Sequence, residues 1–136
     1  MEFIIASHGR YALETKKSCE MIAGYNDKIH VVTFLENMSV AMVIEKYEQI
    51  LAGLGNQEIL IIVDLKGGTP CNAAVMAAER HANVKVVTGL SLAMILSLSL
   101  GESLDQTLSD LKENTKVLSI DRADGNSDAA GEEDEL

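Results

Sequence analysis

The sequence lacks tryptophan and has one proline, two cysteines and few aromatic residues. Cys19 and Cys71 lie far apart and form no C-x-x-C pair, which argues against a disulfide framework or a zinc motif. No apolar run approaches the roughly 20 residues of a membrane-spanning helix, and the N-terminus lacks the residue order of a signal peptide. We therefore expect a reduced, cytoplasmic protein, with any membrane role exerted through a partner.

Positive charge is also scarce, because 11 Lys and Arg face 21 Asp and Glu, for a net charge of -10. Nucleic-acid surfaces depend on clustered basic residues, so this class of partner is excluded. The acids concentrate in residues 121–136, a segment without apolar periodicity that we predict to be a disordered tail. The remaining residues, 1–120, are predicted to form one domain.

Apolar runs and helical periodicity alternate along this domain. The pattern predicts strands at 3–6, 29–34, 58–63 and 84–88, with a last strand at 117–120. Helices are predicted at 10–23, from Ser39 to Gly55, at 70–81, at 91–100 and after Ser103, where Gln106 completes a capping-box signature. The residues predicted to face inward on three of these helices are Ala12, Thr15, Cys19 and Ile22; Val40, Val43, Ile44, Tyr47, Ile50, Leu51 and Leu54; and Leu104, Leu108 and Leu111.

This alternation predicts an α/β fold, doubly wound, with a mainly parallel sheet, right-handed crossovers and helices on both faces. In such sheets the site lies outside the carboxyl ends of the strands. His8 follows the first strand and Asp64 closes the third. We predict the strand order 2-1-3-4, in which these strands are neighbours about 4.8 Å apart, so that the imidazole and carboxylate would hydrogen-bond.

A glycine turn follows Asp64 and leads into a helix. Gly67 and Gly68 permit a tight turn, Thr69 is the predicted N-cap and Pro70 the predicted first helical residue. Free N–H groups at such a helix start bind anions. A histidine with one nitrogen tied to a carboxylate presents the other as a nucleophile, so the pattern predicts histidine phosphorylation without a metal or cofactor.

The joint pattern of S-H-G at residues 7–9 and D-x-x-G-G-T-P-x-N at residues 64–72 resembles the IIA component of the mannose-family bacterial sugar phosphotransferase system (PTS). The resemblance covers residues 1 to about 120. It implies that His8 accepts a phosphoryl group from the phosphocarrier HPr and passes it to a separate IIB component, serving a membrane IIC/IID permease. It also implies that Asp64 orients His8 and that Thr69 lies near the phosphate.

The resemblance further implies that residues 35–38 border the site, and that the protein is a homodimer that exchanges a strand, with 117–120 as the candidate. Some family members carry an aromatic residue in place of Lys66, so this lysine either touches the phosphoryl group in a cradle with Gly67, Gly68 and Thr69 or meets an acidic partner. His30 and His81 have no comparable setting and are predicted to be structural or solvent-facing.

Two alternative functions remain at this point. One is the related phosphotransfer subunit of a dihydroxyacetone kinase, although the G-G-T-P-x-N stretch favours the sugar system. The other is a non-catalytic module that binds phosphate or a nucleotide, such as a receiver-like or flavodoxin-like domain. A receiver needs an acidic pair after its first strand to hold Mg²⁺, and neither that pair nor a P-loop is present.

Overall fold

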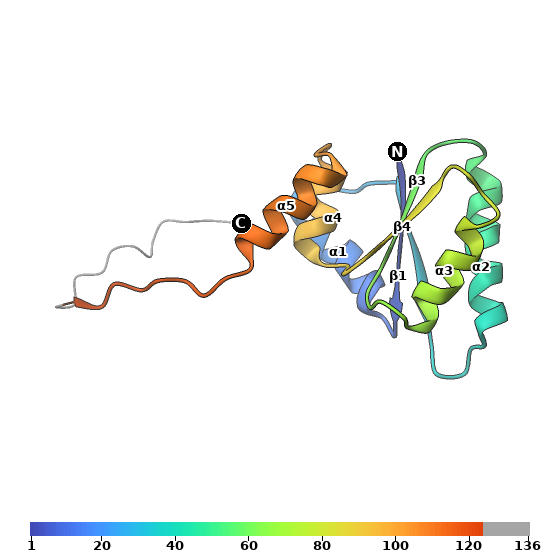
Figure 1. Ribbon diagram of the computed structural model, residues 1–136, viewed down its shortest axis with the longest axis horizontal. Coiled ribbons are helices and arrows are strands. Elements are labelled where there is room, and N and C mark those ends of the chain that lie inside the picture. Colours follow the sequence, from blue (N-terminus) through green and yellow to red (C-terminus); the bar gives the residue numbers. More distant parts are fainter. Residues whose placement is uncertain (124–136) are drawn as a thin grey trace.

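Four short runs rich in β-branched residues form a parallel sheet in the order β2-β1-β3-β4, as predicted. The computed structural model describes residues 1–123. Helices lie on both faces of the sheet, which gives the doubly wound arrangement seen in Figure 1. The elements are β1 (Glu2–His8), α1 (Tyr11–Ala23), β2 (Ile29–Phe34), α2 (Val40–Leu54), β3 (Ile59–Val63), α3 (Thr69–Ala78), β4 (Val84–Thr88), α4 (Leu92–Ser99) and α5 (Leu104–Asn114).

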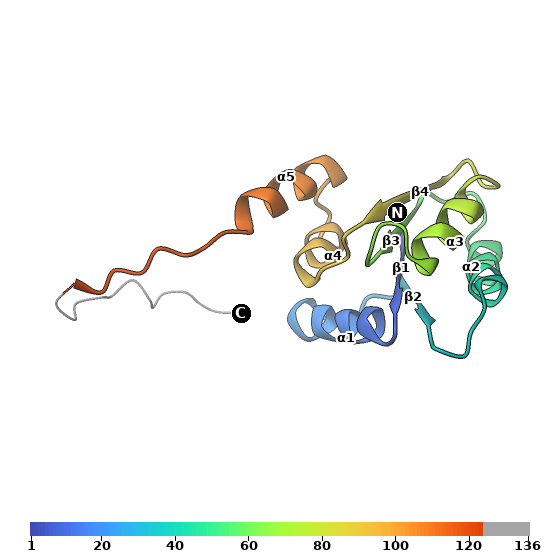
Figure 2. The ribbon, with the colours of Figure 1, turned by 60° about the horizontal axis from the view of Figure 1, so that its bottom comes forward.

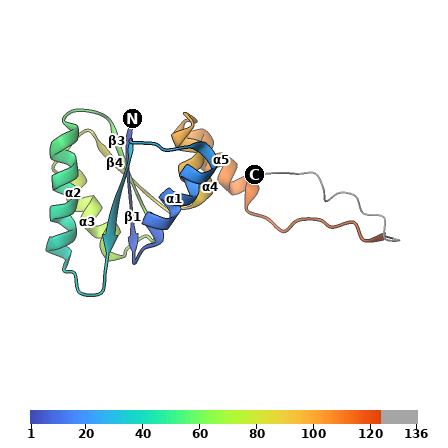
Figure 3. The ribbon, with the colours of Figure 1, turned by 180° about the vertical axis from the view of Figure 1, so that it is seen from behind.

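The central strands are buried on both faces, which explains why β1 and β3 are nearly continuous apolar runs. Their side chains alternate between two cores, one on each face of the sheet. Figures 1 and 3 show the two layers of helices that cover these faces. Ile4 and Ile61 lie in the core under α2 and α3, whereas Ile5 and Ile62 lie in the core under α1 and α4. Helix α5 packs on α4 at the outside of that second layer (Figure 2).

Serine caps begin three of the helices. The hydroxyls of Ser39, Ser91 and Ser103 each accept a hydrogen bond from the backbone N–H three residues on. The amide of Gln106 bonds forward to Asp110 at 2.8 Å, so the predicted capping box at α5 is only half formed.

Helix α3 starts differently from the prediction. Its N-cap is Gly68, without a side-chain cap, so Thr69 and Pro70 occupy the first and second helical positions. The reason is that the N–H of Asn72 donates to the Gly68 carbonyl at 2.9 Å, which draws one more residue into the helix.

Three residues predicted to face inward are exposed, namely Ile22, Val40 and Leu108. Ile22 and Val40 lie in terminal turns, where a helix has fewer neighbours than in its middle. Helix α5 packs mainly on one helix, α4, so its contact stripe is narrow and Thr107 takes the buried position beside Leu108.

After α5 the chain leaves the domain as an extended arm (Figures 1 and 2). Residues 117–120, expected to add a last strand, form none within the described chain, and Val117, Leu118 and Ile120 are exposed. Most of the predicted tail, residues 124–136, lies outside the described residues. No helix in the part of the chain that is described has the length and apolar character needed to cross a bilayer.

Candidate active site

His8 and Asp64 meet at the carboxyl edge of the sheet. His8 is the last residue of β1 rather than the residue after it, and Asp64 follows the last residue of β3. The N–H of Asp64 donates to the carbonyl of Ala6 at 3.2 Å, so the ladder between these two strands continues one step past β3. The strand order predicted from sequence therefore brings the two side chains together.

Both oxygens of the Asp64 carboxylate accept hydrogen bonds. Its Oδ2 lies 2.9 Å from His8 Nδ1 and also accepts the His8 backbone N–H at 2.9 Å, while Oδ1 accepts the Leu65 N–H at 2.9 Å. The side chain of Asp64 is 12% exposed and that of His8 is 45% exposed. Because an ionised carboxylate only accepts hydrogen bonds, the proton of a neutral His8 ring is assigned to Nδ1, and Nε2 keeps its lone pair.

The imidazole is held from two sides. A Cβ on Gly68 would lie 2.7 Å from His8 Cε1 and 3.2 Å from Nε2, so the ring packs directly on the backbone of the glycine turn. The ring of Phe34, which pairs with His8 in the β1–β2 register, stands edge-on at 5.7 Å between centroids. Gly67 has a φ of 86°, a conformation that favours glycine.

The start of α3 lies beside the free nitrogen of His8. The Gly68 carbonyl is bonded into the helix by Asn72, so the Thr69 N–H on the opposite side of that peptide points out of the helix start. Pro70 carries no N–H, and the positive end of the helix dipole adds to the field. Within residues 1–123 no hydrogen bond joins exposed Lys66 to His8.

A depression of about 310 Å³ opens beside the ring, lined by His8, Gly9, Phe34, Leu35 and Glu36. The first part of the predicted 35–38 loop therefore borders the site. Phe34 was missed from sequence, and the only signal that would have found it is its place at the end of β2, opposite His8 in the sheet.

Tyr47, which was predicted only as a core residue, contacts the first turn of α3 next to the site. It is fully buried, and its hydroxyl donates to the Pro70 carbonyl at 2.8 Å. Burial raises the pKa of the Tyr47 phenol, and the nearby charge of the Asp64 carboxylate raises it further. The phenol therefore stays a hydrogen-bond donor throughout the neutral range.

The other histidines lie apart from this site. His30 is bonded through Nε2 to Glu2 and His81 through Nε2 to Glu48, each at 2.8 Å. Cys71 is a small buried residue of the core, as predicted. Among residues 1–123 no group of three or more His, Cys, Asp or Glu side chains gathers in an arrangement for a metal ion.

Fold and site together define a doubly wound α/β protein with a histidine–carboxylate pair at the carboxyl edge of its sheet. A family model described as "PTS system fructose IIA component" matches residues 2–116. The chain belongs to this family, the mannose-type IIA components of the phosphotransferase system, which are phosphotransferase components of sugar transport.

Relatives agree with this assignment. The "PTS system fructose-specific EIIA component" of Bacillus subtilis is 35% identical over 85% of this chain and 80% of that protein. The mannose-specific EIIAB component of Escherichia coli is 28% identical, and the match spans 79% of this chain but 34% of that longer protein. Among solved structures, the mannose/sorbose-specific IIA subunit from Enterococcus faecalis has a TM-score of 0.76 at 35% identity, over 88% of this chain and 94% of that one.

Proposed function

We propose that His8 accepts a phosphoryl group from phospho-HPr in the cytoplasm and passes it to a IIB component of a sugar transporter. The observation that carries this proposal is the Nδ1 contact of 2.9 Å with Asp64, which leaves Nε2 as an accessible nucleophile. Membership of the IIA family supports the same role.

The transfer is a displacement at phosphorus. The lone pair of His8 Nε2 forms the new N–P bond as the bond between phosphorus and the donor histidine breaks, and that bond pair stays on the donor ring. The Nδ1 proton remains in place, so the phosphorylated ring carries positive charge, which the carboxylate of Asp64 stabilises. Transfer to IIB repeats the displacement with His8 as the leaving group.

The cradle for the phosphoryl oxygens is formed by Gly67, Gly68 and Thr69. The support for this is the contact of Gly68 with the Nε2 side of the ring and the outward N–H of Thr69 at the start of α3. A phosphoryl group on Nε2 would meet this helix start without a metal ion. Lys66, in the same turn, supplies a cation for the phosphoryl group or for an acidic surface of a partner.

The decisive experiment is to incubate the protein with phosphoenolpyruvate, enzyme I and HPr. We expect one acid-labile, base-stable phosphate, located on His8 by mass spectrometry. His8→Ala should carry no label, whereas the matched variant His30→Ala should be labelled like the wild type. Absence of label on the wild type, or undiminished label on His8→Ala, would refute the proposal. Supplying a sugar-specific IIB or a dihydroxyacetone kinase as acceptor then separates the sugar system from the kinase alternative.

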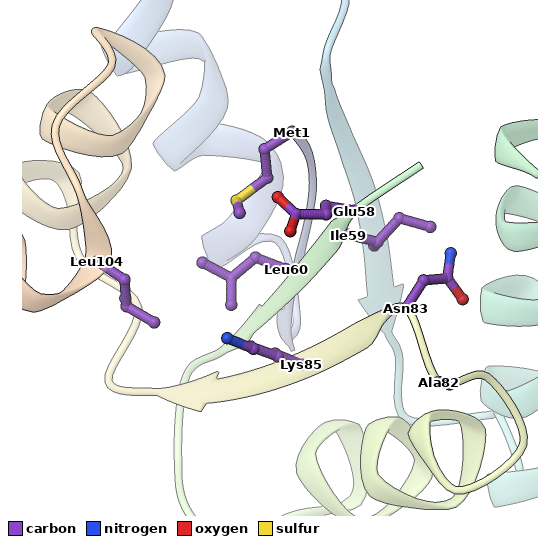
Figure 4. A pocket seen from close by; sticks show the side chains of 8 residues that line it. All are labelled: Met1, Glu58, Ile59, Leu60, Ala82, Asn83, Lys85 and Leu104. Carbon is purple, nitrogen blue, oxygen red and sulfur yellow. The ribbon is translucent and has the colours of Figure 1, made fainter. Parts of the chain in front are cut away.

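We also propose that the protein is a homodimer in which residues 117–120 of each protomer pair with the edge strand β4 of the other. Within the described chain β4 has a strand neighbour on one side only. The arm carries Val117 and Leu118 at 95% and 73% exposure, which is apolar surface that a partner would cover. Beside β4 lies a pocket of about 140 Å³, in which Figure 4 shows Leu60, Lys85 and Leu104 around a common space.

This dimer is tested by the molar mass of the full chain in solution, measured by light scattering. The wild type should have twice the mass of one chain, and the double variant Leu118→Asp/Ile120→Asp should be a monomer. The control is Met21→Asp, which places an aspartate on an exposed apolar residue of α1, outside the arm. A monomeric wild type, or a dimeric double variant, would refute the exchanged arm.

A further inference from the structure

Two side chains outside the histidine–aspartate pair hold the glycine turn in place. Asn72, in the first turn of α3, reaches back and donates its Nδ2 to the Gly67 carbonyl at 3.1 Å. Tyr47, on α2, donates its hydroxyl to the Pro70 carbonyl at 2.8 Å. The two bonds thus hold both ends of the four-residue segment 67–70, and they come from different helices.

This segment meets His8 through its backbone. Gly68 has no side chain, and the position a Cβ would take is only 2.7 Å from His8 Cε1. Any change in the dihedral angles of the turn therefore moves atoms that touch the imidazole, with no flexible side chain between them to absorb the movement. A misplacement of about 1 Å at a reacting centre costs roughly a hundredfold in rate.

If either hydrogen bond were lost, the backbone carbonyl of segment 67–70 that accepts it would not be left buried without a partner. Asn72 is exposed, so its amide would find water if the bond to Gly67 were lost. The Pro70 carbonyl lies inside α3, where it is also placed to accept the backbone N–H four residues on. The Tyr47 phenol, whose pKa is raised by burial, stays protonated and keeps donating.

We propose that Asn72 and Tyr47 are positioning residues that fix segment 67–70 against the His8 imidazole and so set the rate of phosphoryl transfer. The proposal rests on the proposed function of His8 and extends it to residues that touch neither the ring nor the phosphoryl group. They act through the Gly67 and Pro70 carbonyls.

The test compares Asn72→Ala and Tyr47→Phe with the wild type. Each variant should lower kcat for transfer from phospho-HPr about fivefold, since each loses one hydrogen bond. The KM for phospho-HPr should stay within about twofold, because the docking surface is unchanged. The double variant should lose about thirtyfold if the two effects multiply.

The matched control is Asn83→Ala. Asn83 also donates its Nδ2 to two backbone carbonyls, those of Gly55 and Gln57 at 3.1 and 2.7 Å, but at the far end of the sheet. It should lose thermal stability and keep its kcat. Equal losses of kcat in Asn83→Ala and Asn72→Ala would overturn the proposal, as would a wild-type kcat in the double variant.

A readout without phosphate separates this proposal from the function on which it rests. In the unphosphorylated protein, NMR should show a nuclear Overhauser contact between His8 Hε1 and the Gly68 α-protons. That contact should weaken in Asn72→Ala and in the double variant and persist in Asn83→Ala. If the wild type takes no label while the NMR pattern holds, the proposed function fails and the positioning of the turn stands. An unchanged contact in the double variant overturns the positioning role.

Discussion

Two histidine–carboxylate pairs occupy opposite ends of the same sheet. At the carboxyl end His8 meets Asp64 at 2.9 Å, and at the amino end His30 meets Glu2 at 2.8 Å. Both carboxylates are largely buried and both histidines are more exposed than their partners. By distance and burial alone, the two pairs cannot be told apart.

The two pairs differ in which ring nitrogen of the histidine contacts the carboxylate and in the surroundings of the other groups. His8 uses Nδ1, which turns Nε2 toward Gly68 and the start of α3. His30 uses Nε2 itself, and its carboxylate is shared with Lys28 at 3.7 Å. Glu2 thus contacts both His30 and Lys28 and occupies Nε2 of His30, whereas the carboxyl-end pair leaves Nε2 of His8 free to act as a nucleophile. The comparison indicates that orientation and the helix start, rather than the pair itself, define the site.

The largest effect is expected from Gly68→Ala. The new methyl group would lie 2.7 Å from His8 Cε1, closer than van der Waals contact allows, so the ring or the turn must move by about 1 Å. The φ of Gly68, -78°, is one that alanine adopts freely, so the backbone need not be strained. Phosphoryl transfer measured with phospho-HPr should therefore fall about a hundredfold.

Gly53→Ala is the matched control for this prediction. Gly53 lies in α2, and a Cβ there would meet nothing within 4 Å. Alanine is the better helix former, so this variant should gain up to about 1 kcal/mol of stability and transfer phosphate normally. A Gly68→Ala variant that transfers as fast as Gly53→Ala would show that contact with the turn is irrelevant to His8.

The second-largest effect on the transfer rate is expected when a carboxylate is replaced by its amide, a change that can be made at either end of the sheet. Asp64→Asn keeps the shape but removes the charge that favours the phosphorylated ring. Charge-assisted hydrogen bonds contribute about 2 kcal/mol, which corresponds to roughly a thirtyfold loss of transfer rate. Glu2→Gln should leave the transfer rate unchanged and lower the free energy of unfolding by about 1–2 kcal/mol, measured by urea denaturation.

The assignment of the chemistry to the carboxyl end would be wrong if the effects of these two variants on transfer were reversed. A Glu2→Gln variant that slowed transfer while Asp64→Asn did not would place the chemistry at the amino end. Equal small effects on transfer would show that the carboxylate of Asp64 serves stability alone.

The central positions of β1 and β3 and the meeting of His8 with Asp64 were predictable from sequence because both follow from the apolar pattern and from the rule for parallel sheets. The apolar runs of β1 and β3 identify central strands, and the residues that end such strands share one edge. The glycine pair before Pro70 likewise identified the turn, even though the helix begins at Thr69 and not after it.

Other features depend on tertiary contacts that no local pattern encodes. From sequence Phe34 was only the end of a predicted strand and Tyr47 only a core residue. Their relation to His8 and Pro70 appears when β2 and α2 are placed beside the site. Residues 117–120 have the composition of a strand but form none within the described chain, and the proposed dimer would supply a strand for them to pair with. The roles of the cradle residues remain predictions that the transfer experiments test.

The smallest expected effect is on the free energy of unfolding at alkaline pH, and it comes from Tyr47, near the carboxyl ends of the strands. Burial, aided by the Asp64 charge, raises the pKa of Tyr47 above its ordinary value of 10.0. The unfolded chain therefore loses this proton first, and the stabilisation is complete below pH 10 and declines as pH rises above it. Above pH 10 the wild type should lose about 1.4 kcal/mol per pH unit more than Tyr47→Phe, measured by urea denaturation. The amino end offers the control, since Glu2→Gln should keep the wild-type slope there. Parallel slopes for Tyr47→Phe and the wild type would show that the phenol ionises freely in the folded protein.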